Sequence, residues 1–131
     1  MNTKILMTVS SVILGIFGLG LIFVAEEILN LIAASDNQML LLILQILGAT
    51  YFGFAMLNWM TKHNLIGGIY SKPLVIGNLV HFLVGSFALI KIVMHLNSHI
   101  ELMWGLTIIY VVLALCFGYV LMVNPVKIKK S

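Results

Sequence analysis

Few side chains in this sequence combine a reactive type with a position inside an apolar segment. His81 is the deepest ionisable group, about 12 Å into the apolar segment that begins at Pro73. Its imidazole could hydrogen-bond to another helix through Tyr110, Gln45 or a backbone carbonyl. It could equally contact a ligand or take part in a proton relay, since an ionisable group inside a membrane is costly and often functional. These alternatives stay open at the level of the sequence.

The sequence favours neither a cofactor nor a metal site. Haem ligation by two histidines needs a second histidine at the depth of His81, and the others lie in connections or at the end of an apolar segment: His63, His95 and His99. The cysteine, the acids and the histidines match no zinc-ligand spacing. The residue order contains no nucleophile–base pair or glycine-rich phosphate loop. We expect no cofactor, no metal and no enzymatic activity.

Lys91 lies near the end of the third apolar segment, where its ammonium group could extend to the membrane interface. The alternative is an ion pair with Glu26 or Glu27, which follow the first apolar segment at the same level of the membrane. An acid that continues the packing face of a helix favours a cation nearby. Both interpretations of Lys91 stay open.

Polar side chains also gather near the opposite rim of the predicted spans. Asn58, Lys62, Tyr70, Lys72 and Asn78 all fall at this level. Such a cluster of donors could hold an anionic lipid headgroup, although the orientation of the protein explains the lysines equally well.

The candidate ligand-binding residues share a polar side chain inside a span or at its end. They are His81, Asn78, Glu26, Glu27, Lys91 and Asn58.

The composition places these residues in a membrane. Hydrophobic residues make up 62% of the 131 positions and charged residues 8%, against about 45–50% and about 25% in soluble domains. The few charged side chains cannot cover the surface of a soluble protein of this size. With one cysteine and no arginine, disulfide scaffolds and nucleic-acid binding are excluded as well. The lipid bilayer is the expected partner, and nucleic acid is not.

Four apolar runs are long enough to cross a bilayer, which takes about 20 residues each. We predict spans over 5–25, 38–60, 73–95 and 101–123. Between the first two, the pattern over 26–34 indicates a short helix lying in the interface, apolar on one side and polar on the other. Short connections favour antiparallel neighbours. The predicted fold is all-α, an up-down-up-down four-helix transmembrane bundle that forms one domain over 1–131.

The charges sort by sign between the two sides of these spans. Six of the lysines fall on one side, and the acids fall in the two connections on the other side: Glu26, Glu27, Asp36 and Glu101. The positive-inside rule then places both termini in the cytoplasm. We expect a multi-pass protein of the bacterial inner membrane. Lysine without arginine indicates an AT-rich bacterial genome.

Small residues recur at helical spacing in every span and predict where the helices approach each other. They are Ser11, Gly15 and Gly18 in the first span, Gly48, Ala49, Gly53 and Ala55 in the second, Gly77, Gly85 and Ala88 in the third, and Ala114 and Gly118 in the fourth. The pair Ser35 and Gln38 also matches a capping box that would open the second span.

The layout resembles the DoxX-like group of small four-span bacterial membrane proteins. The resemblance is carried by the glycine-rich segment 18–27, by 47–55 in the second span and by 77–81 in the third. It covers nearly the whole chain in layout, without a diagnostic motif. It implies a four-span fold and little chemistry.

Two functions agree with these observations. The first is a non-enzymatic accessory or assembly protein, which packs against another copy of itself as a homo-oligomer or against a larger membrane complex. The second is binding or transport of a small lipophilic or lipid molecule within the bundle, near His81, Asn78 and the end that carries Glu26 and Lys91.

Overall fold

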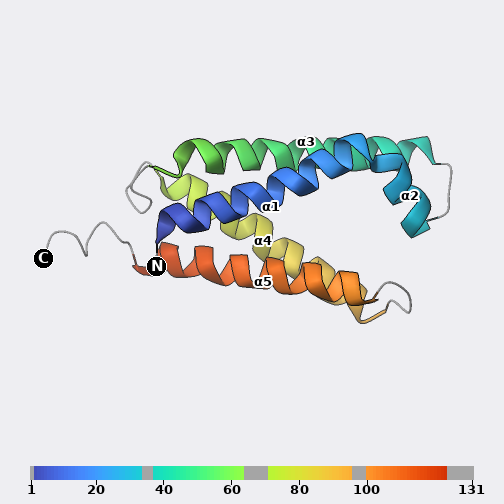
Figure 1. Cartoon of the computed structure of the whole chain (residues 1–131). Coiled ribbons are helices and arrows are strands. Elements are labelled where there is room, and N and C mark those ends of the chain that lie inside the picture. The colour runs from blue at the N-terminus through green and yellow to red at the C-terminus, as the bar shows by residue number, and fades with distance from the viewer. Residues whose placement is uncertain (1, 34–36, 64–70, 96–99, 124–131) are drawn as a thin grey trace, which may run out of the picture. The chain divides into compact units, whose positions relative to one another are not determined.

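A computed structural model describes residues 2–33, 37–63, 71–95 and 100–123 of the chain. All regular structure in these ranges is helical (Figure 1), which confirms the predicted all-α class. The helices are α1 (Thr3–Phe23), α2 (Ala25–Ala33), α3 (Gln38–Thr61), α4 (Lys72–Val93) and α5 (Ile100–Val123). All but the short α2 are long and apolar enough to cross a membrane. The protein is therefore a multi-pass membrane protein.

The helix ends agree with the predicted spans to within two residues, and two local differences have clear causes. α1 ends at Phe23 because the chain bends at Val24, whose N–H still donates to the Gly20 carbonyl oxygen at 2.8 Å. α3 is capped by Asn37, whose side-chain oxygen accepts from two backbone N–H groups of the first turn at 3.0 and 3.2 Å. The predicted N-cap at Ser35 is thus wrong for α3, and Ser35 itself lies outside the described residues.

The chain divides into two units by its internal packing, and each is described by itself. In the unit that holds α1, α2 and α3, the two long helices run antiparallel. The antiparallel order follows from the contacts, because Gly18 meets Gly48 while Gly15, nearer the start of α1, meets Ala55, nearer the end of α3. The side chain of Leu14 is fully buried in this unit.

α4 and α5 form the second unit, also an antiparallel hairpin. Its core is aromatic: the rings of Phe82 and Phe117 stack with centroids 5.7 Å apart, and Tyr110 meets Phe82 edge to face at 5.3 Å. Gly85 leaves room for the Tyr110 ring, since a Cβ there would lie 2.6 Å from Tyr110 Cε1. The antiparallel pairing inside each unit agrees with the predicted up-down-up-down order.

The sequence predicted that the small residues of the second span all pack against a neighbouring helix. In the structure they lie on two different sides of α3. Gly48 and Ala55 are buried against α1, whereas Ala49 and Gly53 are exposed, and a Cβ at Gly53 would meet nothing within 4 Å. The physical reason is the helical repeat, since neighbouring residues point about 100° apart. Ala49 and Gly53 are therefore available for contact with another helix.

Candidate functional site

Polar side chains join α1 to α3 near the end of the unit that carries Lys4 and Lys62, called here the basic end. Asn58 is fully buried, and its Nδ2 donates to Ser10 Oγ at 3.1 Å. The Ser10 hydroxyl in turn donates to a backbone carbonyl of α1 at 3.1 Å. The next residue, Ser11, donates through its Oγ to the Ala55 carbonyl oxygen at 2.7 Å. These groups use their hydrogen bonds to hold the two helices together.

Three buried polar side chains of the α4–α5 unit donate to the backbone of their own helix. Asn78 is fully buried and its Nδ2 donates to the Leu74 carbonyl oxygen at 3.0 Å. Ser86 and Thr107 make the same kind of bond to the carbonyl four residues earlier, at 2.6 and 2.7 Å. Such bonds satisfy a hydroxyl or amide in an apolar medium.

His81 lies on α4 one turn after Asn78 and is half-buried. Its ring meets Phe82 edge to face at 5.0 Å and lies 5.8 Å from Tyr110, tilted by 43°. Tyr110, one of the hydrogen-bond partners that the sequence offered for His81, thus lies beside its ring, and the hydrogen bond stays a prediction. The histidine belongs to the aromatic core of the hairpin.

The charged side chains of the α1–α3 unit gather at its two ends. Lys62 at the basic end lies over the Trp59 ring, with Nζ 2.8 Å from the centroid. Glu26 and Glu27 open α2 at the other end, called here the acidic end, and both are exposed. The unit is therefore electrically polarised along its length.

In the α4–α5 hairpin, Lys91 is exposed in the last turns of α4, at the same end as Glu101 in the first turn of α5. The predicted ion pair of Lys91 with Glu26 or Glu27 would join residues of different units and stays a prediction.

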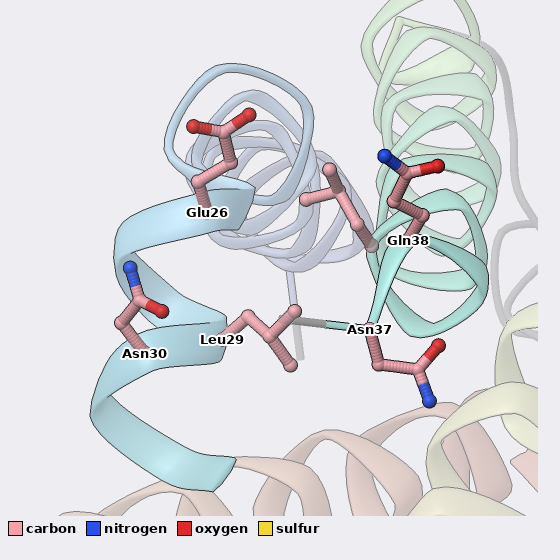
Figure 2. A pocket seen from close by; sticks show the side chains of 6 residues that line it. Glu26, Leu29, Asn30, Asn37 and Gln38 are labelled. Carbon is pink, nitrogen blue, oxygen red and sulfur yellow. The ribbon is translucent and has the colours of Figure 1, made fainter. Parts of the chain in front are cut away.

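A pocket opens at the acidic end between α2 and the start of α3 (Figure 2). It has a volume of about 200 Å³. Glu26 and Asn30 lie on the α2 side, Asn37 and Gln38 on the α3 side, and Leu29 lies between them. Leu41 completes the lining. A carboxylate and three amides around two leucines can bind a small polar group with a short apolar part.

A second, larger depression lies between α4 and α5 and is almost wholly apolar. Its volume is about 550 Å³, within the range of small-molecule sites. Leu79 and Leu83 line it from α4, and the small residues Ala114 and Gly118 line it from α5. It can accept a hydrocarbon chain rather than a polar molecule.

The predicted site residues are divided between the two units. Asn78, His81 and Lys91 belong to the α4–α5 unit, while Glu26 and Asn58 lie near opposite ends of the α1–α3 unit. Of the six candidates, Glu26 lines the polar pocket.

The sequence missed three polar residues that line this pocket with Glu26: Asn30, Asn37 and Gln38. A signal for them was present, because Asn30 comes one turn after Glu26 on a short amphipathic helix. Asn37 and Gln38 lie just before and at the start of the next span. Ser10 was missed as the partner of Asn58 because it lies outside the small-residue stripe of the first span, which begins at Ser11.

No group of three or more His, Cys, Asp or Glu side chains is placed to hold a metal ion in the described ranges. Comparison of the chain with protein-family models, curated proteins and solved structures found no match. The geometry of the two units is therefore the basis for the functional proposals.

Proposed function

We propose that this membrane protein is a non-enzymatic assembly protein that pairs with a second copy of itself through α3. The observation that carries the proposal is the exposed side of α3 formed by Gln45, Ala49 and Gly53, called here the α3 face. α3 is the least covered of the four spans. Of the residues in its most hydrophobic stretch, 11% are buried, against 22–33% in the corresponding stretches of the other three.

The residue types on the α3 face favour a helix as its partner. Ala49 and Gly53 are four residues apart, a spacing of small residues that lets two backbones approach closely within a membrane. Gln45 lies on the same side, about 10 Å inside the span. Its amide both donates and accepts, so two copies related by a twofold axis can bond to each other there. Lipid offers no such partner.

The orientation and location of the protein are part of this proposal. The basic end of the α1–α3 unit would face the cytoplasm, with both termini, and the acidic end would face outward. The membrane would be the inner membrane of a bacterium. The resemblance to DoxX-like proteins supports a four-span layout and adds no activity.

Cysteine cross-linking tests the pairing directly. Ala49→Cys is made in a Cys116→Ser background, so that the introduced thiol is the sole one in the chain. We expect dimers to form on oxidation in membranes. Ile16→Cys is the matched control, because Ile16 is exposed on α1 well inside its span. A dimer yield no higher than in this control would contradict the pairing.

A polar substitution series tests the role of the amide. Gln45→Leu should lower the association constant of the dimer about fivefold to thirtyfold, since a hydrogen bond between polar side chains of two helices contributes about 1–2 kcal/mol in model helices. Gln45→Asn, which keeps the amide, should lose less. Equal dimerisation in all three proteins, measured by energy transfer in vesicles, would remove Gln45 from the interface.

The apolar depression between α4 and α5 favours a second candidate function, binding of a lipophilic molecule. Gly118→Leu would fill this depression, because Gly118 lines it and a Cβ there would lie at an ordinary van der Waals distance of 3.7 Å from Leu79 Cδ1. We expect the variant to lose labelling by a photoactivatable fatty acid. Gly105→Leu is the control, since Gly105 faces open space on α5. Equal labelling of both variants and the natural protein would exclude the site.

A further inference from the structure

We infer that the polar pocket at the acidic end binds a primary ammonium group carried on a short alkyl chain. Such a group occurs in the ethanolamine headgroup of a phospholipid and in free small amines. The inference is independent of the pairing through α3, because the pocket is formed within one copy by α2 and the start of α3.

Packing holds the two sides of the pocket in place. α2 is fixed by Ala25 and Leu29, which are 2% and 4% exposed. Glu26 and Asn30 are one turn apart on α2, so both reach the pocket from the same side. On the other side, the cap formed by Asn37 fixes the first turn of α3, which carries Gln38. The backbone on both sides of the pocket is thus held by packing and by the helix cap.

The lining matches the hydrogen-bonding needs of an ammonium group. A primary ammonium has three N–H donors and accepts none, so it requires oxygen atoms around it. The Glu26 carboxylate supplies charge-assisted acceptors, and the amide oxygens of Asn30 and Gln38 can supply neutral ones. Leu29 and Leu41 offer an apolar surface for the methylene groups that carry the ammonium. A quaternary ammonium lacks the N–H donors and fits this lining poorly.

The charge around the pocket is negative without a nearby counterion in the described part of its unit. Glu26 lines the pocket and Glu27 follows it on α2, whereas Lys4 and Lys62 lie at the basic end. The length of α1 separates the two ends by about 30 Å, several times the screening length of about 8 Å in physiological salt. The lysines of this unit therefore do not neutralise Glu26.

The position of the pocket makes it accessible both from the bilayer and from water. α2 begins directly after α1, a span, so the pocket lies at the level of the lipid headgroups. An ethanolamine headgroup reaches this level from the bilayer, and a free amine reaches it from water. Both present the same ammonium to Glu26, and the experiment has an arm for each.

The lipid arm uses the full chain in nanodiscs of phosphatidylglycerol that contain equal amounts of phosphatidylethanolamine and phosphatidylcholine. Native mass spectrometry measures which lipid stays bound after release. We expect phosphatidylethanolamine to be retained over phosphatidylcholine by about tenfold or more, because the quaternary ammonium of phosphatidylcholine cannot donate a hydrogen bond to the carboxylate. Glu26→Gln should abolish this preference.

The matched control is Glu27→Gln, which removes the same charge one residue away from a side chain that does not line the pocket. It should keep the preference, whereas Asn30→Ala should weaken it. An equal loss in Glu26→Gln and Glu27→Gln would mean general surface charge and would overturn the proposal.

The free-amine arm uses nanodiscs of phosphatidylglycerol alone and isotope-labelled ethanolamine, with binding measured by saturation-transfer NMR. Binding that Glu26→Gln removes identifies a free amine as a ligand, and a preference seen only in the lipid arm identifies the headgroup. No dependence on Glu26 in either arm overturns the proposal. Ammonium binding that appears only after Lys91→Met would also overturn it, because the protein's own lysine would then be the occupant.

Discussion

Gly18 and Gly48 face each other across the α1–α3 contact so closely that a Cβ on either residue would lie 2.9 Å from the carbonyl oxygen of the other. A Cβ on Gly18 would also lie 2.7 Å from the backbone nitrogen of Phe52. Backbone atoms cannot move aside as the end of a side chain can. The two helices therefore approach at a distance that only glycine permits, and this contact sets the geometry of the hairpin.

Gly18→Ala should destabilise the α1–α3 unit by about 1–3 kcal/mol, the usual cost of forcing extra atoms into a close contact. Gly20→Ala is the matched control in the same helix, because a Cβ there meets nothing within 4 Å. We expect the control to be neutral or slightly stabilising, since alanine favours helix over glycine. Unfolding in mixed detergent measures both, and equal stability of the two variants would contradict the close contact.

The hydrogen bond from Asn58 to Ser10 should couple α1 and α3 energetically. A double-mutant cycle with Ser10→Ala and Asn58→Leu isolates this coupling. We expect about 0.6–1.7 kcal/mol, the span between the mean and the maximum measured for polar contacts between helices in a membrane. Additive effects of the two substitutions would show that the bond does not stabilise the hairpin.

Gly85→Ala should destabilise the α4–α5 hairpin because the added methyl group would meet the buried Tyr110 ring at 2.6 Å. The expected loss is about 1–3 kcal/mol. In a Tyr110→Leu background the same substitution should cost less, since a leucine side chain can turn away. Thermal unfolding of the four proteins measures this, and an unchanged cost in the second background would argue against the contact.

The orientation can be measured with single thiols in the Cys116→Ser background. Leu31→Cys places a thiol on exposed α2 at the acidic end, and His63→Cys places one at the basic end. A reagent that cannot cross the membrane should label the first in intact cells and the second only after permeabilisation, because lysine-bearing ends stay inside. The reverse pattern would invert the proposed topology.

Much of the fold could be predicted because each signal is local. A run of about 20 apolar residues has few alternatives to a transmembrane helix, so α1, α3, α4 and α5 lie where the composition places them. The amphipathic pattern after the first span likewise predicted α2. The cap of α3 was less certain, because Ser35 and Asn37 are both suitable types two residues apart, and the chain uses Asn37.

The candidate site was harder to predict, because it depends on which side of a helix faces which neighbour. Their polarity marked Asn58 and Asn78 as ligand-binding residues, yet both are fully buried. Asn58 donates to Ser10 Oγ, and Asn78 donates to the Leu74 carbonyl oxygen. Polarity alone does not separate a packing amide from a binding amide. The pocket residues Asn30 and Gln38 come from different helices, and the sequence marks each as polar without showing that both line one pocket.

The sequence by itself determined the class of protein, the four spans and the separation of charge between their ends, because hydropathy and charge act along the chain residue by residue. Only the tertiary structure decided that Gly48 faces α1 while Gly53 faces away, and that Glu26 shares a pocket with Gln38. The physical reason is that lipid gives no hydrophobic preference for one side of an apolar helix over another. Close packing and hydrogen bonds between helices make that choice.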